Sequence, residues 1–171
     1  VVIVLSLDLG LALLAIADME FRSGDKATGA ARYEEALQLH GSALNKKPTN
    51  TGIKFRTARA QALAGDFFLR SGDSKRAGAL YISAFKLTKE LADADPKTFE
   101  YKWDLGFIHY RIGLHALRTK DASAKAHFQN CSTIRTQLAD QDKPNQRRQM
   151  ELMLALAHAG EHEKATDIAA K

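Results

Sequence analysis

The fold is decided by residues 70–96, which read RSGDSKRAGALYISAFKLTKELADADP. Gly72 can take the left-handed conformation that ends a helix, and Asp73 can accept hydrogen bonds from the free amides of the next helix. Beyond this turn the apolar side chains recur at the spacing of one helix face, at Ala77, Leu80, Tyr81, Ala84, Phe85, Leu87 and Leu91. Pro96 cannot continue the hydrogen-bond ladder. We therefore predict a helical hairpin whose second helix covers residues 74–94.

The hairpin recurs along the chain. Prolines follow at 48-residue intervals, at Pro48, Pro96 and Pro144. The turn is present as Arg22-Ser23-Gly24-Asp25 and, weakened, as Arg118-Thr119-Lys120-Asp121, after which the apolar pattern matches only if one residue is dropped. A repeat of this length indicates an array of one supersecondary unit whose members must stack to bury their apolar faces. We predict a single domain over residues 1–171 with seven to eight helices, in units at about 1–48, 49–96, 97–144 and, incomplete, 145–171.

The N-terminal residues carry two conflicting signals. Leu5, Leu7, Leu9 and Leu11 alternate with polar residues and glycine, which locally indicates a strand. The repeat instead predicts a helix, because Asp8-Leu9-Gly10 recurs two periods later as Asp104-Leu105-Gly106. We predict a helix from about Leu7 and leave residues 1–5 open. The chain starts at Val1 rather than Met, so we expect a piece of something longer, with an upstream membrane segment as an open alternative.

Charge and cysteine usage favour a plain helical scaffold. The net charge is +5, but basic and acidic residues are interleaved, as on a solvated helical surface. The compact basic groups are Lys54, Arg56 and Arg59, and Arg147-Arg148; neither lies in a nucleic-acid motif, so we expect no nucleic-acid partner. The single Cys131 excludes an intrachain disulfide, and we expect it to be a small buried residue. The compartment is not indicated.

No residue pattern predicts a metal site, a cofactor or catalysis. His158 and His162 have the i, i+4 spacing of metal ligands, but Gly160 lies between them at an expected turn, so we expect them on different helix faces. We find no glycine-rich phosphate loop, no nucleophile elbow and no framed carboxylate pair. We therefore predict a protein that is not an enzyme.

The repeat resembles the tetratricopeptide repeat. Its small and large packing positions are matched by Gly65, Phe68, Gly72, Asp73, Ala77, Tyr81, Ala84 and Pro96. Two features depart from that family: its repeat has about 34 residues, and the usual first-helix tryptophan is Gln61 and His109 here. The greater length resembles the long repeats of bacterial multidomain proteins, including regions that follow kinase domains. The resemblance implies an all-α, right-handed superhelical solenoid of antiparallel helical hairpins.

The resemblance also implies a function, which is to bind a peptide or protein partner on the concave face built by the first helix of each hairpin. On the predicted first helices, the positions about 100 degrees from the packing stripe include Ala62 and Leu114 and the six residues that we select as binding candidates: Arg59, Asp66, Arg70, Phe107, Tyr110 and Arg118.

Two groups of residues, a series of arginines and an apolar stripe, have a structural interpretation as well as a binding one. Arg22, Arg70 and Arg118 could bind acidic side chains or a terminal carboxylate. A cation at a helix C-terminus also complements the helix dipole, and Asp18 and Asp66 stand four residues before two of the arginines. The stripe Trp103, Phe107, Tyr110, Leu114 and Leu117 either faces a partner or is buried between neighbouring helices.

The alternative function is a structural, sensory or self-association arm of a larger protein, membrane-tethered or kinase-linked. An open solenoid end exposes apolar surface unless it is capped, so a homodimer is one expectation of this alternative.

Overall fold

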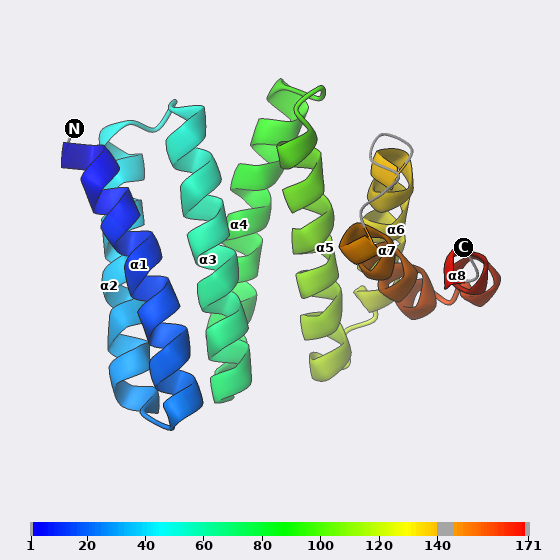
Figure 1. Cartoon of the computed structure of the whole chain (residues 1–171), viewed down its shortest axis with the longest axis horizontal. Helices are drawn as coiled ribbons and strands as arrows, with labels where there is room; N and C mark the ends of the chain where they lie inside the picture. The colour runs from blue at the N-terminus through cyan, green and yellow to red at the C-terminus, as the bar shows by residue number, and fades with distance from the viewer. Residues whose placement is uncertain (1, 140–145, 170–171) are drawn as a thin grey trace. The chain divides into compact units, whose positions relative to one another are not determined.

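A computed structural model of the chain describes residues 2–139 and 146–169. All regular secondary structure in these two ranges is α-helical, in eight helices (Figure 1). The helices are α1 (Val2–Ser23), α2 (Lys26–Lys46), α3 (Thr51–Ser71), α4 (Ser74–Ala94), α5 (Phe99–Thr119), α6 (Ala124–Ala139), α7 (Gln146–Ala159) and α8 (His162–Ala169). The predicted all-α class and the series of helical hairpins are confirmed.

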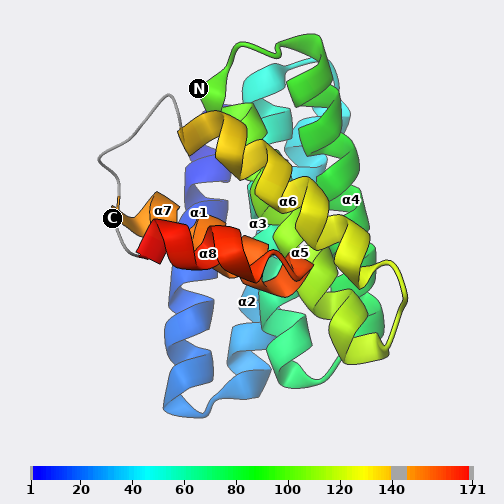
Figure 2. The ribbon, with the colours of Figure 1, turned by 90° about the vertical axis from the view of Figure 1, so that its right-hand side faces the viewer.

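The chain forms two compact units, Val1–Leu91 and Ala92–Lys171. The first contains the hairpin α1–α2, helix α3 and most of α4, and the second contains the hairpins α5–α6 and α7–α8 (Figure 2). The grouping of all residues into one repeat domain stays a prediction. Among the described residues, no helix combines the length and the apolar character that crossing a bilayer requires.

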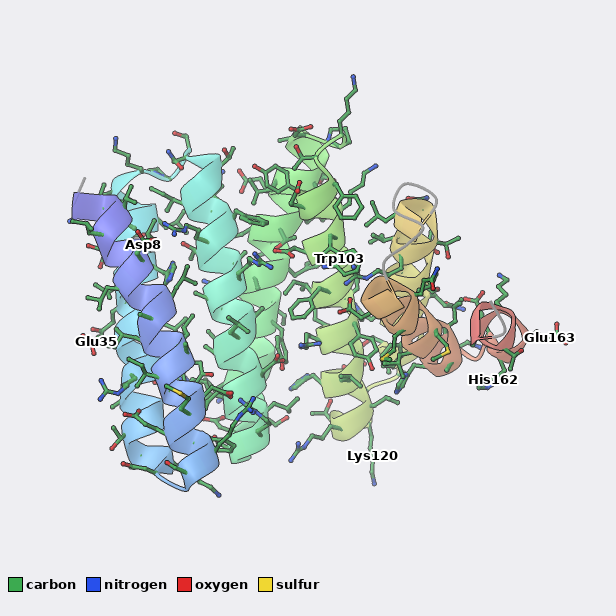
Figure 3. All side chains as sticks on the ribbon, in the orientation of Figure 1. Asp8, Glu35, Trp103, Lys120, His162 and Glu163 are labelled. Atoms are coloured by element: carbon green, nitrogen blue, oxygen red, sulfur yellow. The ribbon has the colours of Figure 1, made fainter. Side chains whose placement is uncertain are left out.

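The turns inside the hairpins have the predicted geometry. Gly24, Gly72 and Gly160 have positive φ angles of 97°, 94° and 86°. The Asp25 carboxylate accepts a hydrogen bond from the Thr28 amide, so it caps the second helix as predicted. In the third hairpin Lys120 stands in the glycine position, with φ 58° (Figure 3). The left-handed backbone conformation of the turn is therefore kept in the third hairpin, where lysine stands in place of glycine.

The helix ends agree with the proline positions as far as the structure describes them. α2 ends at Lys46 and α4 at Ala94, each two residues before a proline. Pro144 lies outside the described residues. At the N-terminus the conflict is resolved in favour of a helix, because Leu7, Leu13, Leu14 and Ala17 are buried at helical spacing against the rest of the first unit. Leu5, Leu9 and Leu11, which belong to the strand-like alternation, are exposed on the outside of this helix.

The two helices of a hairpin approach closely at small residues. A Cβ atom added to Gly65 would lie 2.6 Å from the ring of Tyr81, and one added to Gly113 would lie 2.8 Å from the ring of Phe128. In the first hairpin the glycine is on the second helix, where a Cβ on Gly29 would lie 2.9 Å from the backbone oxygen of Ala17. Gly65 and Gly113 are 48 residues apart, whereas their aromatic partners are 47 apart, in agreement with the one-residue slip after Asp121.

Replacing Gly29 by Ala should destabilise the first unit by about 1–3 kcal/mol, because the contact is with backbone that cannot rotate away. Gly41→Ala in the same helix is the matched control. Its Cβ would meet nothing within 4 Å, so the higher helix propensity of Ala should stabilise by about 0.5–1 kcal/mol. Urea unfolding followed by circular dichroism would measure both, and equal effects of the two substitutions would contradict the close-approach argument.

Replacing Lys120 by Gly should stabilise the third hairpin. The left-handed conformation costs a side-chain-bearing residue about 1–2 kcal/mol, part of which is offset by the greater freedom of glycine in the unfolded chain, so we expect a net gain of about 0.5 kcal/mol. Lys125→Gly, at an exposed helical position of α6, should lower stability by about 0.5–1 kcal/mol. Thermal unfolding of both variants would check the opposite signs.

Candidate partner-binding surface

In the first unit the first helices of the two hairpins, α1 and α3, lie in contact and carry charges of both signs on their shared surface. Asp8 of α1 forms an ion pair with Arg56 of α3 (Figure 3 labels Asp8). Near the other end of α1, Asp18 pairs with Arg22 at 2.8 Å and with Arg70 of α3 at 2.6 Å. We call the surface made by these five residues the α1/α3 polar surface. The Asp8–Arg56 and Asp18–Arg70 pairs link equivalent helices of successive repeats, whereas Asp18–Arg22 lies within α1.

Arg70 is the most tightly held of the predicted site residues. Its guanidinium carbon lies 5.0 Å from the centre of the Phe21 ring, its Nε donates to the Asp66 backbone oxygen at 3.4 Å, and its Nη2 donates to Asp18. The hydrogen bond from Arg70 is the largest cause of a lowered pKa of Asp18. A ligand carboxylate would therefore have to compete with Asp18 for this guanidinium.

Asp66 is positioned by the second helix of its own hairpin. Its carboxylate accepts a hydrogen bond from the Tyr81 hydroxyl at 2.8 Å. Arg70 also donates from Nε to the Asp66 backbone oxygen and forms an ion pair with the Asp18 carboxylate. Asp18 forms the suggested i, i+4 pair with Arg22.

Two further positions on α3 behave differently from each other. Arg59 is exposed, with its guanidinium carbon 5.2 Å from the centre of the Phe55 ring. Ala62 is only 1% exposed, so it cannot contact a ligand and leaves the set of candidate residues. In the basic group predicted from the sequence, Lys54 forms an ion pair with Glu90 and Arg56 forms one with Asp8.

In the second unit the candidates on α5 divide between core and surface. Tyr110 and Leu114 pack against a buried cluster of Ala116, Ala124, Phe128 and Ala159. The guanidinium carbon of Arg111 lies 3.9 Å from the centre of the half-buried Phe107 ring. Arg118 is exposed in the last turn of α5. Of the apolar stripe, the structure therefore places Tyr110 and Leu114 against the core and leaves Leu117 exposed.

A buried polar cluster in the second unit was not predicted. The side chain of Arg135, on α6, is only 3% exposed. Its guanidinium carbon lies 3.3 Å from the centre of the Trp103 ring, and its Nη2 pairs with Glu151 of α7 at 3.1 Å. A Cβ on Gly106 would lie 3.3 Å from its Nε, so this glycine makes room for it. Burial lowers the pKa of Arg135 and raises that of the adjacent Cys131 to about 11. The cysteine is therefore a buried thiol, as expected.

His158, His109 and His127 make contacts inside the second unit. His158 donates from Nδ1 to the Leu154 backbone oxygen at 2.8 Å and its ring lies against Phe128, whereas His162 is exposed at the start of α8. The Nδ1 atoms of His109 and His127 are 3.0 Å apart, so the Nδ1 of one ring carries a hydrogen and donates it while the Nδ1 of the other ring accepts. Burial lowers the pKa of His109 to about 4. Within the described ranges, no three metal-binding side chains come together.

His40 is a fully buried histidine in the first unit. A Cβ on Gly10 of α1 would lie 2.8 Å from its Nε2, and its backbone oxygen accepts a hydrogen bond from Thr57 of α3 at 3.4 Å. Neither ring nitrogen has a hydrogen-bond partner within the described part of the chain. Burial, and secondarily the charge of Arg56, lowers the pKa of His40 to about 4.

Comparison with known proteins supports the fold. No family model matches the chain, and neither does any curated protein. The chain is similar to the crystal structure of BtubC (BKLC) from P. vanneervenii, with a TM-score of 0.61 and 18% sequence identity over 94% of this chain and 60% of that one. A de novo designed helical repeat protein, DHR64, matches with a TM-score of 0.31 and 11% identity over 99% of this chain and 96% of that one. The chain thus spans 60% of the length of the BtubC chain.

His40 should make the first unit lose stability as the pH falls from 7 to 5. Its folded pKa of about 4 lies below the usual value of 6.5, so the unfolded chain binds the proton first, and protonation then favours unfolding. This single group should cost about 2 kcal/mol over that interval. Urea unfolding at several pH values should show a smaller slope for His40→Met than for the wild type. His162→Gln, at an exposed histidine, should leave the slope unchanged.

Proposed function

We propose that this protein is a tetratricopeptide-like scaffold that binds a peptide or protein partner along the first helices of its hairpins and carries out no catalysis. The observation that carries the proposal is the α1/α3 polar surface. Its charged side chains are partly exposed, come from two repeats, and are held in place by one another and by Phe21. Such a surface offers an extended ligand charged groups that are already ordered.

The packing inside the hairpins supports the tetratricopeptide part of the proposal. Gly65 lies against Tyr81, and Ala77 and Ala84 are fully buried, as the small and large positions of that family require. The repeat differs in length, and Gln61 and His109 stand where the family usually has tryptophan. The proposal is therefore of a long variety of the repeat.

The ligand that fits the α1/α3 polar surface is acidic. Arg22, Arg56 and Arg70 are the cations of this surface, with Arg59 exposed on α3, and Asp8 and Asp18 are its anions. A ligand carboxylate can replace Asp18 on Arg70 without disturbing its contact with the Phe21 ring. We expect Arg118 on α5 to add a similar contact in the second unit. No nucleic acid is expected as partner.

A panel of fluorescent acidic and neutral peptides, titrated against the protein, would test the proposal. Arg70→Glu should weaken the best acidic ligand by at least about tenfold, since a charge-assisted hydrogen bond is worth about 1.5–3 kcal/mol. Asp18→Asn should strengthen the same ligand by a few fold, because it removes the internal competitor of Arg70. Lys86→Glu, with the same charge change at an exposed position of α4, should have no effect.

Tyr110 is left out of this series because it packs against the core, so its truncation would lower stability as well as binding. Equal affinities of the wild type and Arg70→Glu would show that the ligand lies elsewhere. Failure of every peptide to bind at millimolar concentration would contradict peptide binding itself.

The second candidate function is that of a structural or self-association arm of a larger protein. It is favoured by the exposed apolar side chains of α1, which include Leu5, Leu9 and Met19. Light scattering over a concentration series separates the two: a concentration-dependent dimer supports this candidate, and a monomer up to high concentration counts against it.

A further inference from the structure

The outer face of α1 carries an unpartnered apolar stripe. Leu5, Leu9, Ala12, Ile16 and Met19 follow one another at intervals of four and three residues, which places them within about 80° of one another around the helix. Leu5, Leu9 and Met19 are 61%, 51% and 62% exposed. The residues that α1 buries in its own unit, such as Leu7, Leu14 and Ala17, lie on the opposite side. We call this stripe the α1 outer face.

The repeat shows what such a face packs against. The residues of α3 that lie 48 positions later are Ile53, Thr57, Ala60, Ala64 and Phe67. All five are buried, between 0% and 6% exposed. The stripe that is open on α1 is therefore closed on α3, at equivalent positions of the same repeat.

The partner of this stripe on α3 is the preceding hairpin, and above all its second helix α2. Ile53 packs in a cluster with Ala43 of α2 and Leu7 of α1. The Thr57 hydroxyl donates to the backbone oxygen of His40. The ring of Phe67 lies 4.3 Å from that of Tyr33, centre to centre, and 5.2 Å from that of Phe21. Tyr33, His40 and Ala43 of α2 thus contact one face of α3 along its length.

We propose that the α1 outer face is the docking surface for the second helix of one more hairpin of this 48-residue kind, joined directly ahead of α1. The occupant presents an aromatic residue, a buried polar residue and an alanine in the places of Tyr33, His40 and Ala43. It lies on α1 as α2 lies on α3, and reaches α1 through a connection as short as residues 47–50. The face has few charges, which suits an apolar helix rather than the acidic ligand proposed for the α1/α3 polar surface. The inference does not depend on peptide binding.

The stripe also has the four-and-three spacing of a coiled-coil seam, so a second copy of the chain is the competing occupant. The buried equivalents on α3 favour the hairpin. They include Thr57, whose hydroxyl donates to the backbone oxygen of His40 on α2, and two fully buried alanines. Self-pairing of α1 is therefore an outcome that the experiment must be able to detect.

The test is a tandem protein in which residues 1–48 are repeated immediately ahead of Val1 of the full chain. This insertion keeps the 48-residue period, with Val1 in the place that Thr49 has after Pro48. A single cysteine is introduced into the original copy as Leu9→Cys or, as a matched control, Leu11→Cys. Leu9 is equivalent to the buried Thr57, whereas Leu11 is equivalent to the exposed Arg59. The native Cys131 is buried and gives little background.

In the 171-residue chain both introduced thiols should react freely with a maleimide reagent. In the tandem protein the thiol at position 9 should react at least about tenfold more slowly, while that at position 11 should change little. Helical content measured by circular dichroism should rise by the contribution of the added hairpin. Leu9→Glu should lower the melting temperature of the tandem protein and leave that of the 171-residue chain unchanged, and Leu11→Glu should change neither.

Three results would overturn the proposal. Unchanged reactivity at position 9 in the tandem protein would show that the face does not receive a hairpin, and so would an added hairpin that contributes no helicity. If the thiol at position 9 were instead protected in the 171-residue chain in step with a dimer seen by sedimentation, the occupant would be a second copy. None of these readings involves the peptide-binding assay, so the two proposals can fail separately.

Discussion

The close approach of the two helices in each hairpin is the contact on which the other features depend. In the first three hairpins a glycine stands where the two helices come close, at Gly29 in the first hairpin, Gly65 in the second and Gly113 in the third. With the helices this close, an aromatic ring such as Tyr81 can cover the glycine and still reach across to the Asp66 carboxylate. The close approach of the two backbones thus lets Tyr81, on the second helix, orient Asp66, on the first helix.

The polar groups of the chain have two different physical roles. On α1 and α3, partly exposed arginines and aspartates form ion pairs that each contribute little stability, which suits the exchange proposed for a ligand. His40 and Arg135 are buried, where desolvation dominates their titration, and removal of Glu151 would leave the Arg135 charge buried without its ion pair. The first group is suited to recognition and the second to holding one packing arrangement.

Much of the fold could be predicted because its signals are local. Gly72 and Asp73 predicted a turn, and Pro96 a helix end, from conformational preferences that need no knowledge of distant residues. The contacts of the candidate site were harder to predict from the sequence. Arg70 was correctly placed at the end of a first helix, but its partner Asp18 lies 52 residues away on α1. A pairing such as Asp8 with Arg56, 48 residues apart, could have been suggested by the period itself. The Arg135 and Trp103 contact follows no such period and could not.

The sequence by itself determined the repeat, its length, its turns and, in the described part of the chain beyond the first residues, the positions of the helices, because these depend on interactions within one hairpin. The tertiary structure decided which apolar stripe is buried and which is open. Leu9 and Thr57 occupy the same place in the repeat, yet the leucine is exposed and the threonine is buried. Burial depends on the presence of a neighbouring hairpin, and that is a property of position in the array rather than of the residue.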